Sequence, residues 1–295
     1  MAQHVEITHH TTYSFDRPVV ASPHLVRLRP VASPWAVVTR HDQHITPEAH
    51  LLHWQQDPFG NDVARVSFLA PIRGFDIEVA IKAELTPRNP FDFLLDPAAE
   101  HSPFPYGDDL RLDLEPHLRV DEPGPMVAAF LTGIDRRSQP TTDFVTALGR
   151  SVASTVRYEI RMETGVLSPE LTLQRGAGSC RDSAWLLLHL FRHVGLAARF
   201  VSGYLVDLTP DGDQTDLHAW AEVYLPGAGW VGIDPTSGLL TAEGHIPLAR
   251  SPHPRGAAPV DGTTEPCHVH LVHSNSVRRL ADDDGSAPPT TTGLG

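Results

Sequence analysis

The chain has 295 residues, of which 41% are hydrophobic and 20% charged, as in an ordinary soluble globular protein with room for two domains. Its formal net charge of −13 argues against nucleic acid as a partner. No apolar run reaches the roughly 18 residues of a membrane span, and the first residues lack the pattern of a secretory signal. Two cysteines, Cys180 and Cys267, cannot form a disulfide framework, so we expect a cytoplasmic protein that binds no membrane.

Residues 1–115 are predicted to form a β-rich N-terminal domain. Residues 75–85 alternate strictly between apolar and polar side chains, which is the pattern of a half-buried strand. Residues 4–15 and 63–72 have the pattern of further strands, and the Pro, Gly and Asn within 57–62 indicate a turn. These features predict an antiparallel β-sandwich or a curled sheet.

Eight prolines between Thr86 and Met126 mark the connection to a second domain, and regular structure is not expected to persist there. We assign residues 116–281 to a catalytic core with a C-terminal β-extension. Residues 282–295 are acidic and rich in Pro and Thr, which predicts a disordered tail.

The second domain is predicted to carry helices followed by strands. An apolar stripe of helical period runs through residues 141–158, and a second helix is expected from Cys180 to Gly195, a glycine suited to a left-handed cap. Strands are expected at residues 198–208, 218–225 and 230–234. A β-rich part, then helices, then an antiparallel sheet indicates an α+β fold.

Cys180 stands at the predicted start of the second helix, where Ser179 and Asp182 fit the pattern of a capping box. The helix N-terminus favours a thiolate by about 0.3–1 kcal/mol, and its N–H groups point to where an oxyanion would form. Gly176 and Gly178 leave the backbone open to a substrate strand. Most buried cysteines are inert, but a structural cysteine would more naturally lie in mid-helix. We therefore interpret Cys180 as a nucleophile.

A nucleophilic cysteine also needs a base and a group that orients the base. His218 begins one predicted strand, and Asp234 ends the next strand along the chain. Trp220 lies on the same strand face as His218, where its ring would shield an ion pair from water. The hypothesis is a triad of Cys180, His218 and Asp234.

The triad places a condition on the hairpin between the two strands. An even-membered loop at residues 226–229 would direct His218 and Asp234 to opposite faces of the sheet. Pairing Tyr224 with Trp230 instead makes the two side chains diagonal neighbours on one face. We therefore predict an odd-membered loop or a bulge.

Other polar residues give weaker signals. Gln174, six residues before the nucleophile, is a candidate second donor to the oxyanion, and an exposed loop position is the alternative. His189 and His193 lie four apart on one helix, and His268 and His270 lie on one face of a predicted strand, but neither pair has a marked third ligand. We predict no metal site and no cofactor.

The resemblance to a known family lies in two long segments, GAGSCRDSAWLLLHLFRHVGLAARFVSGYL and DLHAWAEVYLPGAGWVGIDPTSG. They resemble the transglutaminase-like superfamily of bacterial papain-fold thiol enzymes. Residues 18–30 and 54–68 are similar to the β-rich N-terminal region of bacterial members. In that family Cys, His and Asp form the catalytic triad, and the matching positions are Cys180, His218 and Asp234. The resemblance implies that the Cys-bearing helix packs on an antiparallel sheet.

These features predict a thiol acyl-transfer enzyme that acts on a peptide or protein substrate. The Cys180 thiol forms a thioester with the acyl group of an amide, His218 serves as acid and base, and Asp234 orients the imidazole. Water as the acceptor gives a cysteine peptidase or amidase, which we favour, and an amine gives protein-glutamine or peptide transamidation. Two alternatives stay open, a non-catalytic peptide-binding module and an enzyme that works only beside a partner protein.

Overall fold

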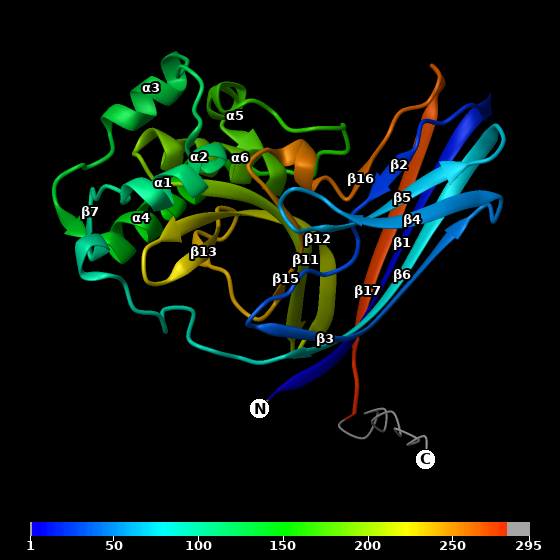
Figure 1. The fold of residues 1–295 in the computed structure, drawn as a ribbon, viewed down its shortest axis with the longest axis horizontal. Coiled ribbons are helices and arrows are strands. Elements are labelled where there is room, and N and C mark those ends of the chain that lie inside the picture. The colour runs from blue at the N-terminus through cyan, green and yellow to red at the C-terminus, as the bar shows by residue number, and fades with distance from the viewer. Residues whose placement is uncertain (1, 282–295) are drawn as a thin grey trace.

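The computed structural model describes residues 2–281, and the predicted tail at 282–295 lies outside the described residues. Two four-stranded antiparallel sheets form a sandwich at one end of the molecule (Figure 1). In order across the first sheet, the strands are β17 (Val269–Arg279), β1 (Gln3–Val19), β6 (Ile72–Leu85) and β3 (Ala36–Thr46). The second sheet has the order β16 (Val260–Asp261), β2 (His24–Val26), β5 (Asp62–Phe68) and β4 (His50–Gln56).

The alternating pattern of residues 75–85 is confirmed in β6, where buried side chains alternate with more exposed ones. Ile7 of β1 pairs with Ile81 of β6, and both side chains are fully buried in the core between the sheets. The predicted turn at 57–62 joins β4 to β5, and Asp57 Oδ1 accepts the backbone N–H groups of Phe59 and Asn61. The sandwich prediction is therefore confirmed.

The strand β17 closes the first sheet from the far end of the sequence. It pairs with β1 from Val5 opposite Arg279 to Phe15 opposite Val269, so the two ends of the described chain lie side by side. The sequence assigned this segment to the catalytic core as a β-extension, whereas its hydrogen bonds belong to the N-terminal sheet. The proposed boundary at residue 115 stays a prediction.

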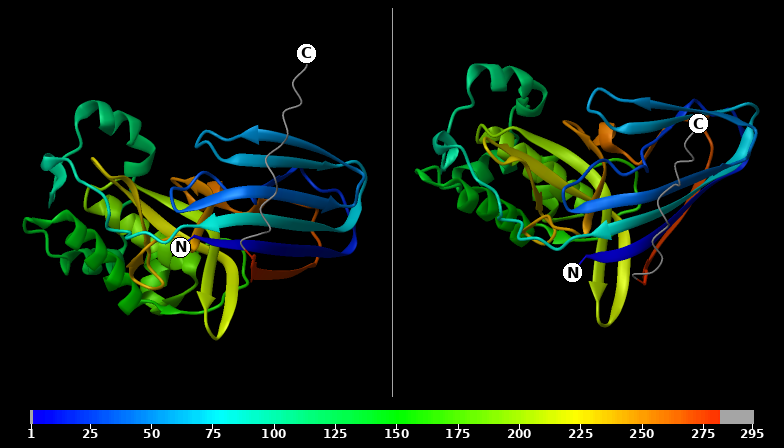
Figure 2. Two further views of the ribbon diagram at one scale, coloured as in Figure 1. Left: turned by 90° about the horizontal axis from the view of Figure 1, so that it is seen from below. Right: turned by 60° about the horizontal axis from the view of Figure 1, so that its bottom comes forward.

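A third sheet carries the second half of the chain. In order, its antiparallel strands are β14 (Leu239–Leu240), β13 (Gly229–Asp234), β12 (Gly212–Leu225), β11 (Ala198–Thr209) and β15 (His245–Ser251). A hydrophobic core joins this sheet to the helices α4 (Thr141–Thr155), α5 (Pro169–Arg175) and α6 (Cys180–His193). The helices lie on the opposite side of the sheet region from the sandwich (Figure 2). The α+β prediction is confirmed.

The proline-rich connection contains more helix than its composition predicts. It holds a 3₁₀ turn (Pro97–Ala99) and the helices α1 (Asp108–Asp113), α2 (Glu115–Leu118) and the start of α3 (Pro125–Thr132). Residues 106–115 contain no proline, and Asp108 and Asp109 stand in the first turn of α1, where acidic side chains favour a helix. The expectation of irregular structure is wrong for these residues. None of the helices described in residues 2–281 is long and apolar enough to cross a membrane.

Four short strands and a 3₁₀ turn complete the architecture. The short strands β7 (His101–Ser102) and β8 (Gln139–Pro140) pair antiparallel, and β9 (Arg157–Tyr158) pairs parallel with β10 (Ala177–Gly178). A second 3₁₀ turn (Pro254–Ala257) follows β15. The pair β9–β10 matters for function because it ends two residues before Cys180.

Gly149 on α4 offers a test of how α4 meets the sheet. A Cβ atom at this position would lie 2.6 Å from Cγ2 of Ile233, which is closer than packed atoms allow. Alanine in a helix is normally more stable than glycine by about 1 kcal/mol, but here we expect Gly149→Ala to lower the free energy of unfolding by about 1–3 kcal/mol. Urea denaturation measures the change. Ser151→Ala, at an exposed position on the same helix, is the control and should be nearly neutral, and a stabilising Gly149→Ala would contradict this packing.

Candidate active site

Buried polar contacts fix the end of α6 that carries Cys180. The backbone N–H and the Oγ of Ser179 donate to Oδ2 of Asp182 at 2.9 and 2.8 Å, and the Asp182 N–H donates to the Ser179 carbonyl at 3.1 Å. The predicted capping box is therefore confirmed. It places Cys180 at the first helical position, with its side chain 8% exposed.

Arg161 extends this network, a role that no sequence motif indicated. Its Nε and Nη2 donate to the two carboxylate oxygens of Asp182, each at 3.0 Å. Burial alone would raise the pKa of Asp182, but the hydrogen bonds from Arg161, the Leu167 N–H and Ser179 lower it below its ordinary value. The charged carboxylate therefore connects the loop 161–167 to the start of α6.

The glycine before Ser179 serves packing rather than open access. A Cβ atom on Gly178 would lie 2.9 Å from Cβ of Asp182, so no larger residue fits beside the capping carboxylate. The Gly178 carbonyl accepts the Glu159 N–H at 2.9 Å, which occupies it within the structure. Gly178 is buried, in contrast to the expectation of a bare backbone there.

The hairpin between β12 and β13 has the register that the triad requires. Tyr224 pairs with Trp230 and Leu225 with Gly229, which leaves a three-residue loop at 226–228. Continued to the ends of the strands, this register sets Asp234 opposite Trp220 and makes His218 its diagonal neighbour. The prediction of an odd-membered loop is confirmed.

His218 lies between the thiol and the carboxylate. Its Nε2 is 3.1 Å from Oδ2 of Asp234, and the two side chains are 9% and 4% exposed. Burial alone would lower the pKa of His218, but the hydrogen bonds with Asp234 and Cys180 and the charges of both raise it to about 10. Because Nε2 faces Asp234, Nδ1 is the nitrogen left for Cys180. An imidazolium in this position stabilises a neighbouring thiolate.

Asp234 holds more partners than the sequence predicted. Burial alone would raise its pKa, but the hydrogen bonds with His218 and the Thr236 N–H and the nearby His245 ring hold the pKa well below its usual range. The Thr236 N–H donates to Oδ1 at 2.8 Å, and Nε2 of His245 lies 3.5 Å from Oδ2. His245 starts β15 and carries no motif of its own. The one available signal was its position after a glycine, directly before an apolar strand.

The remaining predicted site residues lie around this centre or away from it. Trp220 is 1% exposed, and its ring meets the His245 ring edge-on with centroids 5.2 Å apart, so it covers the centre from one side. Gln174 lies on an exposed part of α5, and no hydrogen bond joins its side chain to a described residue. Its role as an oxyanion donor stays a prediction.

Three side chains in the centre have the composition of a metal site. His218, Asp234 and His245 place one possible ligand atom each within 4.8 Å of one another, and they are the one such group among residues 2–281. However, the Ala242 N–H donates to Nδ1 of His245 at 3.3 Å, so the neutral ring carries its proton on Nε2. A metal needs the lone pair of that nitrogen, so the residues present do not fit a metal ion.

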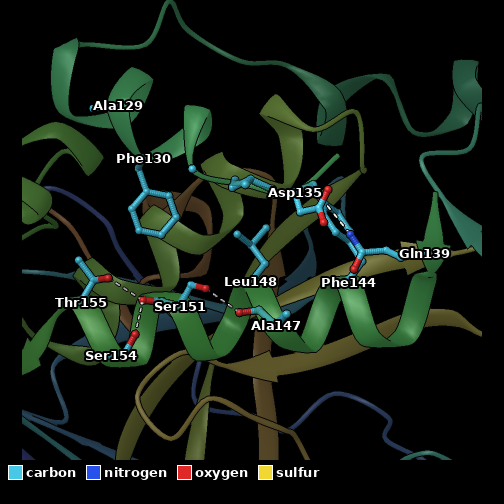
Figure 3. Close-up of a pocket in the computed structure, with 12 residues that line it drawn as sticks. Ala129, Phe130, Asp135, Gln139, Phe144, Ala147, Leu148, Ser151, Ser154 and Thr155 are labelled. Atoms are coloured by element: carbon cyan, nitrogen blue, oxygen red, sulfur yellow. Dashed lines mark hydrogen bonds between the residues drawn. The ribbon is translucent and has the colours of Figure 1, made fainter. Parts of the chain in front are cut away.

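A pocket of about 460 Å³ lies between α3 and α4, and no triad residue lines it (Figure 3). Its hydroxyl groups already have partners, because Ser151 donates to the Ala147 carbonyl and both Ser154 and Thr155 donate to the Ser151 carbonyl. Phe130 and Phe144 supply apolar walls. Because these hydroxyl groups are already bonded, we interpret the pocket as a gap between helices.

The arrangement supplies the parts of thiol catalysis. A thiol at a helix start, an imidazole in contact with it and a buried carboxylate behind the imidazole are the three groups that acyl transfer through cysteine requires. In residues 2–281 no acceptor takes the backbone N–H of Cys180, which leaves this donor for an oxyanion. The α+β core with this site defines a papain-like fold.

Comparison with protein families identifies the class more closely. Residues 128–235 match the model of the transglutaminase-like superfamily, and residues 5–84 match that of the bacterial transglutaminase-like N-terminal region. Residues 128–235 therefore carry a transglutaminase-like core, and the bacterial transglutaminase-like N-terminal region precedes it.

Individual relatives agree with this placement. An uncharacterized protein of Mycobacterium tuberculosis is 30% identical over 157 residues, which is 50% of this chain and 44% of the relative, so the match spans less than half of the relative's length. A protein-glutamine gamma-glutamyltransferase of Pseudomonas aeruginosa is 38% identical over 66 residues, 20% of this chain and 10% of the relative. A protein of Cytophaga hutchinsonii, provisionally described as a cysteine protease, has the same fold, with a TM-score of 0.71, 17% identity and coverage of 96% of this chain and 92% of that protein.

The raised pKa of His218 predicts how stability depends on pH. The folded value of about 10 lies above the unfolded value of 6.5. The stabilisation is therefore complete below about pH 6.5 and is lost as the pH rises through about 10. Wild type should exceed His218→Gln in free energy of unfolding by more at pH 6 than at pH 10.

Chemical denaturation at several pH values measures this difference. His24→Gln is the control, because burial lowers the pKa of His24, and the advantage of wild type over that variant should instead shrink as the pH falls. A His218 difference that stays constant from pH 6 to pH 10 would contradict the ion pair with Asp234.

Proposed function

We propose that this protein is a thiol acyl-transfer enzyme that hydrolyses an amide or peptide bond, as a cysteine peptidase or amidase. The observation that carries the proposal is the position of His218, whose Nε2 lies 3.1 Å from the buried carboxylate of Asp234 and whose pKa the interactions with Asp234 and Cys180 raise. The transglutaminase-like core and the shared fold with the Cytophaga hutchinsonii protein support it.

Acylation begins from the thiolate–imidazolium pair. The Sγ of Cys180 attacks the substrate carbonyl carbon and forms the C–S bond, while the carbonyl electrons move to oxygen. The Cys180 N–H at the start of α6 donates to this oxyanion. When the oxyanion collapses, the C–N bond breaks and His218 gives its Nδ1 proton to the leaving amine. The products of this step are a thioester, a free amine and a neutral imidazole.

Deacylation runs through the same residues in the reverse order. Neutral His218 takes a proton from water, and the water oxygen attacks the thioester carbonyl. The C–S bond then breaks, which releases a carboxylic acid and restores the thiolate beside the imidazolium. Asp234 keeps its charge in both half-reactions, because its pKa is held well below its usual range, and it stabilises the imidazolium that is present before acylation and forms again in deacylation.

A second candidate function replaces water by an amine, which yields a new amide instead of an acid. The local match to the protein-glutamine gamma-glutamyltransferase of Pseudomonas aeruginosa favours this candidate, with 38% identity over 66 residues. Both functions share the thioester and differ in the group that resolves it. A peptide or protein substrate, the possibility of a partner protein and a cytoplasmic location all stay part of the proposal.

The central test is the reactivity of the two free thiols. If Cys180 is a thiolate paired with His218, iodoacetamide at pH 6 should alkylate it at least tenfold faster than Cys267. Peptide mapping by mass spectrometry measures both rates in one sample. His218→Ala should remove the difference, and equal rates in wild type would contradict an activated thiol.

Three further variants test the turnover of a peptide library. Cys180→Ala should abolish cleavage and Asp234→Asn should lower it by orders of magnitude, because the imidazole loses its charged partner. Cys267→Ala should leave it unchanged. Folded Cys180→Ala with full activity would exclude the mechanism, and a wild type that binds peptides without any turnover would favour the binding-module alternative.

Hydrolysis and transamidation are separated by the product. The peptide library is incubated in buffer alone and then with a millimolar primary amine. Mass spectrometry distinguishes a carboxylic acid, formed when water resolves the thioester, from an amide, formed when the amine resolves it. We expect acid to predominate in both. An amide as the main product with the amine present, and no acid without it, would assign the protein to transamidation.

A further inference from the structure

His245 is a buried histidine that the mechanism does not yet use. It stands at the first position of β15, its side chain is 12% exposed, and its Nε2 lies 3.5 Å from Oδ2 of Asp234. No described residue makes a standard hydrogen bond to this Nε2 atom. A buried imidazole aimed at a catalytic carboxylate requires an explanation in terms of that carboxylate.

The protonation of His245 follows from its other ring nitrogen. The Ala242 N–H donates to Nδ1 at 3.3 Å, so Nδ1 holds a lone pair and the proton of the neutral ring is on Nε2. This Nε2 atom lies 3.5 Å from Oδ2 of Asp234, the carboxylate oxygen that His218 also contacts. We propose that His245 is a positioning residue, which donates its Nε2–H to Asp234 and holds the carboxylate in line with His218. This inference rests on the proposed function.

The backbone around His245 has little freedom to move. The His245 N–H donates to the Ala242 carbonyl at 2.9 Å, and the Val206 N–H donates to the Gly244 carbonyl at 2.8 Å. A Cβ atom on Gly244 would lie 2.4 Å from the Val206 carbonyl oxygen, so glycine is required for this approach to β11. The edge contact with Trp220 then fixes the plane of the ring.

The carboxylate needs this third contact because of where it lies. Asp234 is the last residue of β13, and its Oδ1 is held by the Thr236 N–H at 2.8 Å. Without His245, Oδ2 would be held by His218 alone, the group that it must orient. A ring fixed from outside the triad lets the carboxylate hold its position while His218 gains and loses its proton.

The test reads the protonation of His218 without requiring a substrate. The positive charge of an imidazolium attracts anionic iodoacetate to the neighbouring thiolate, but it does not attract neutral iodoacetamide. The rate of alkylation of Cys180 by iodoacetate, divided by the rate with iodoacetamide, therefore falls at the pH where His218 loses its proton. In wild type this fall should follow the pKa of His218, about 10. The groups that face His218 are Asp234, Cys180 and His245, and the variants change only the last of these.

His245→Leu fills the space but has no hydrogen-bond donor. In this variant we expect the ratio of the iodoacetate rate to the iodoacetamide rate to fall at a pH at least one unit lower than in wild type. His245→Gln should keep this pH within about 0.3 unit of wild type, because the glutamine amide can offer an N–H near the Nε2 position. If His245→Leu does not fold, His245→Asn replaces it, since its shorter amide stops before Asp234. For a peptide that the wild type cleaves, kcat of His245→Leu (or of His245→Asn in its place) should be about tenfold lower than that of wild type, and KM should stay within about twofold of the wild-type value.

A merely structural role would give another result. His24→Gln removes a buried histidine of the N-terminal core and should lower stability without moving the ratio. An unmoved ratio in the donor-free variant, or a failure of His245→Gln to restore it, would overturn the positioning role. If the ratio responds as expected but no peptide or amine substrate is turned over, the proposed function fails while the role of His245 stands.

Discussion

The buried carboxylate of Asp234 is the constraint on which the rest of the site depends. A charge that is 96% withdrawn from solvent is stable only when hydrogen-bonded partners surround it, because desolvation alone would neutralise it. Its partners come from β12, from β15 and from the turn that follows β13. The carboxylate thereby fixes the relative positions of three segments that are far apart in sequence, and one of them carries the imidazole that faces the thiol.

A second buried carboxylate does the same for the nucleophile. Asp182 is 0% exposed, and its partners Ser179 and Arg161 fix the start of α6 and the loop beside it. The two carboxylates act on different members of the triad, since one holds the helix that bears Cys180 and the other holds His218. The thiol and the imidazole are thus positioned by two separate networks, one around Asp182 and one around Asp234.

The sequence predicted the parts of this site that local rules determine. The capping pattern at Ser179 and Asp182 located the start of α6. Because side chains alternate between the faces of a strand, the triad hypothesis also required an odd-membered loop or a bulge in the hairpin between His218 and Asp234. The sequence could not predict that β15 lies beside β11, because strand order across a sheet is not written in either strand. His245 was missed for that reason, as was the return of β17 to β1. The helix α1 was missed because the count of prolines outweighed the ten-residue gap between two of them.

The strands β11 and β15 join the site to the N-terminal sandwich. Phe200 near the start of β11 packs in the core with α6, whereas Tyr204 further along the same strand packs in the core of the sandwich. In β15, Ile246 and Leu248 belong to the sandwich core, and His245 immediately before them faces Asp234. The segment that places His245 beside Asp234 therefore packs against the core of the N-terminal sandwich. The sandwich contributes no member of the triad, yet its core residues set the position from which His245 reaches Asp234.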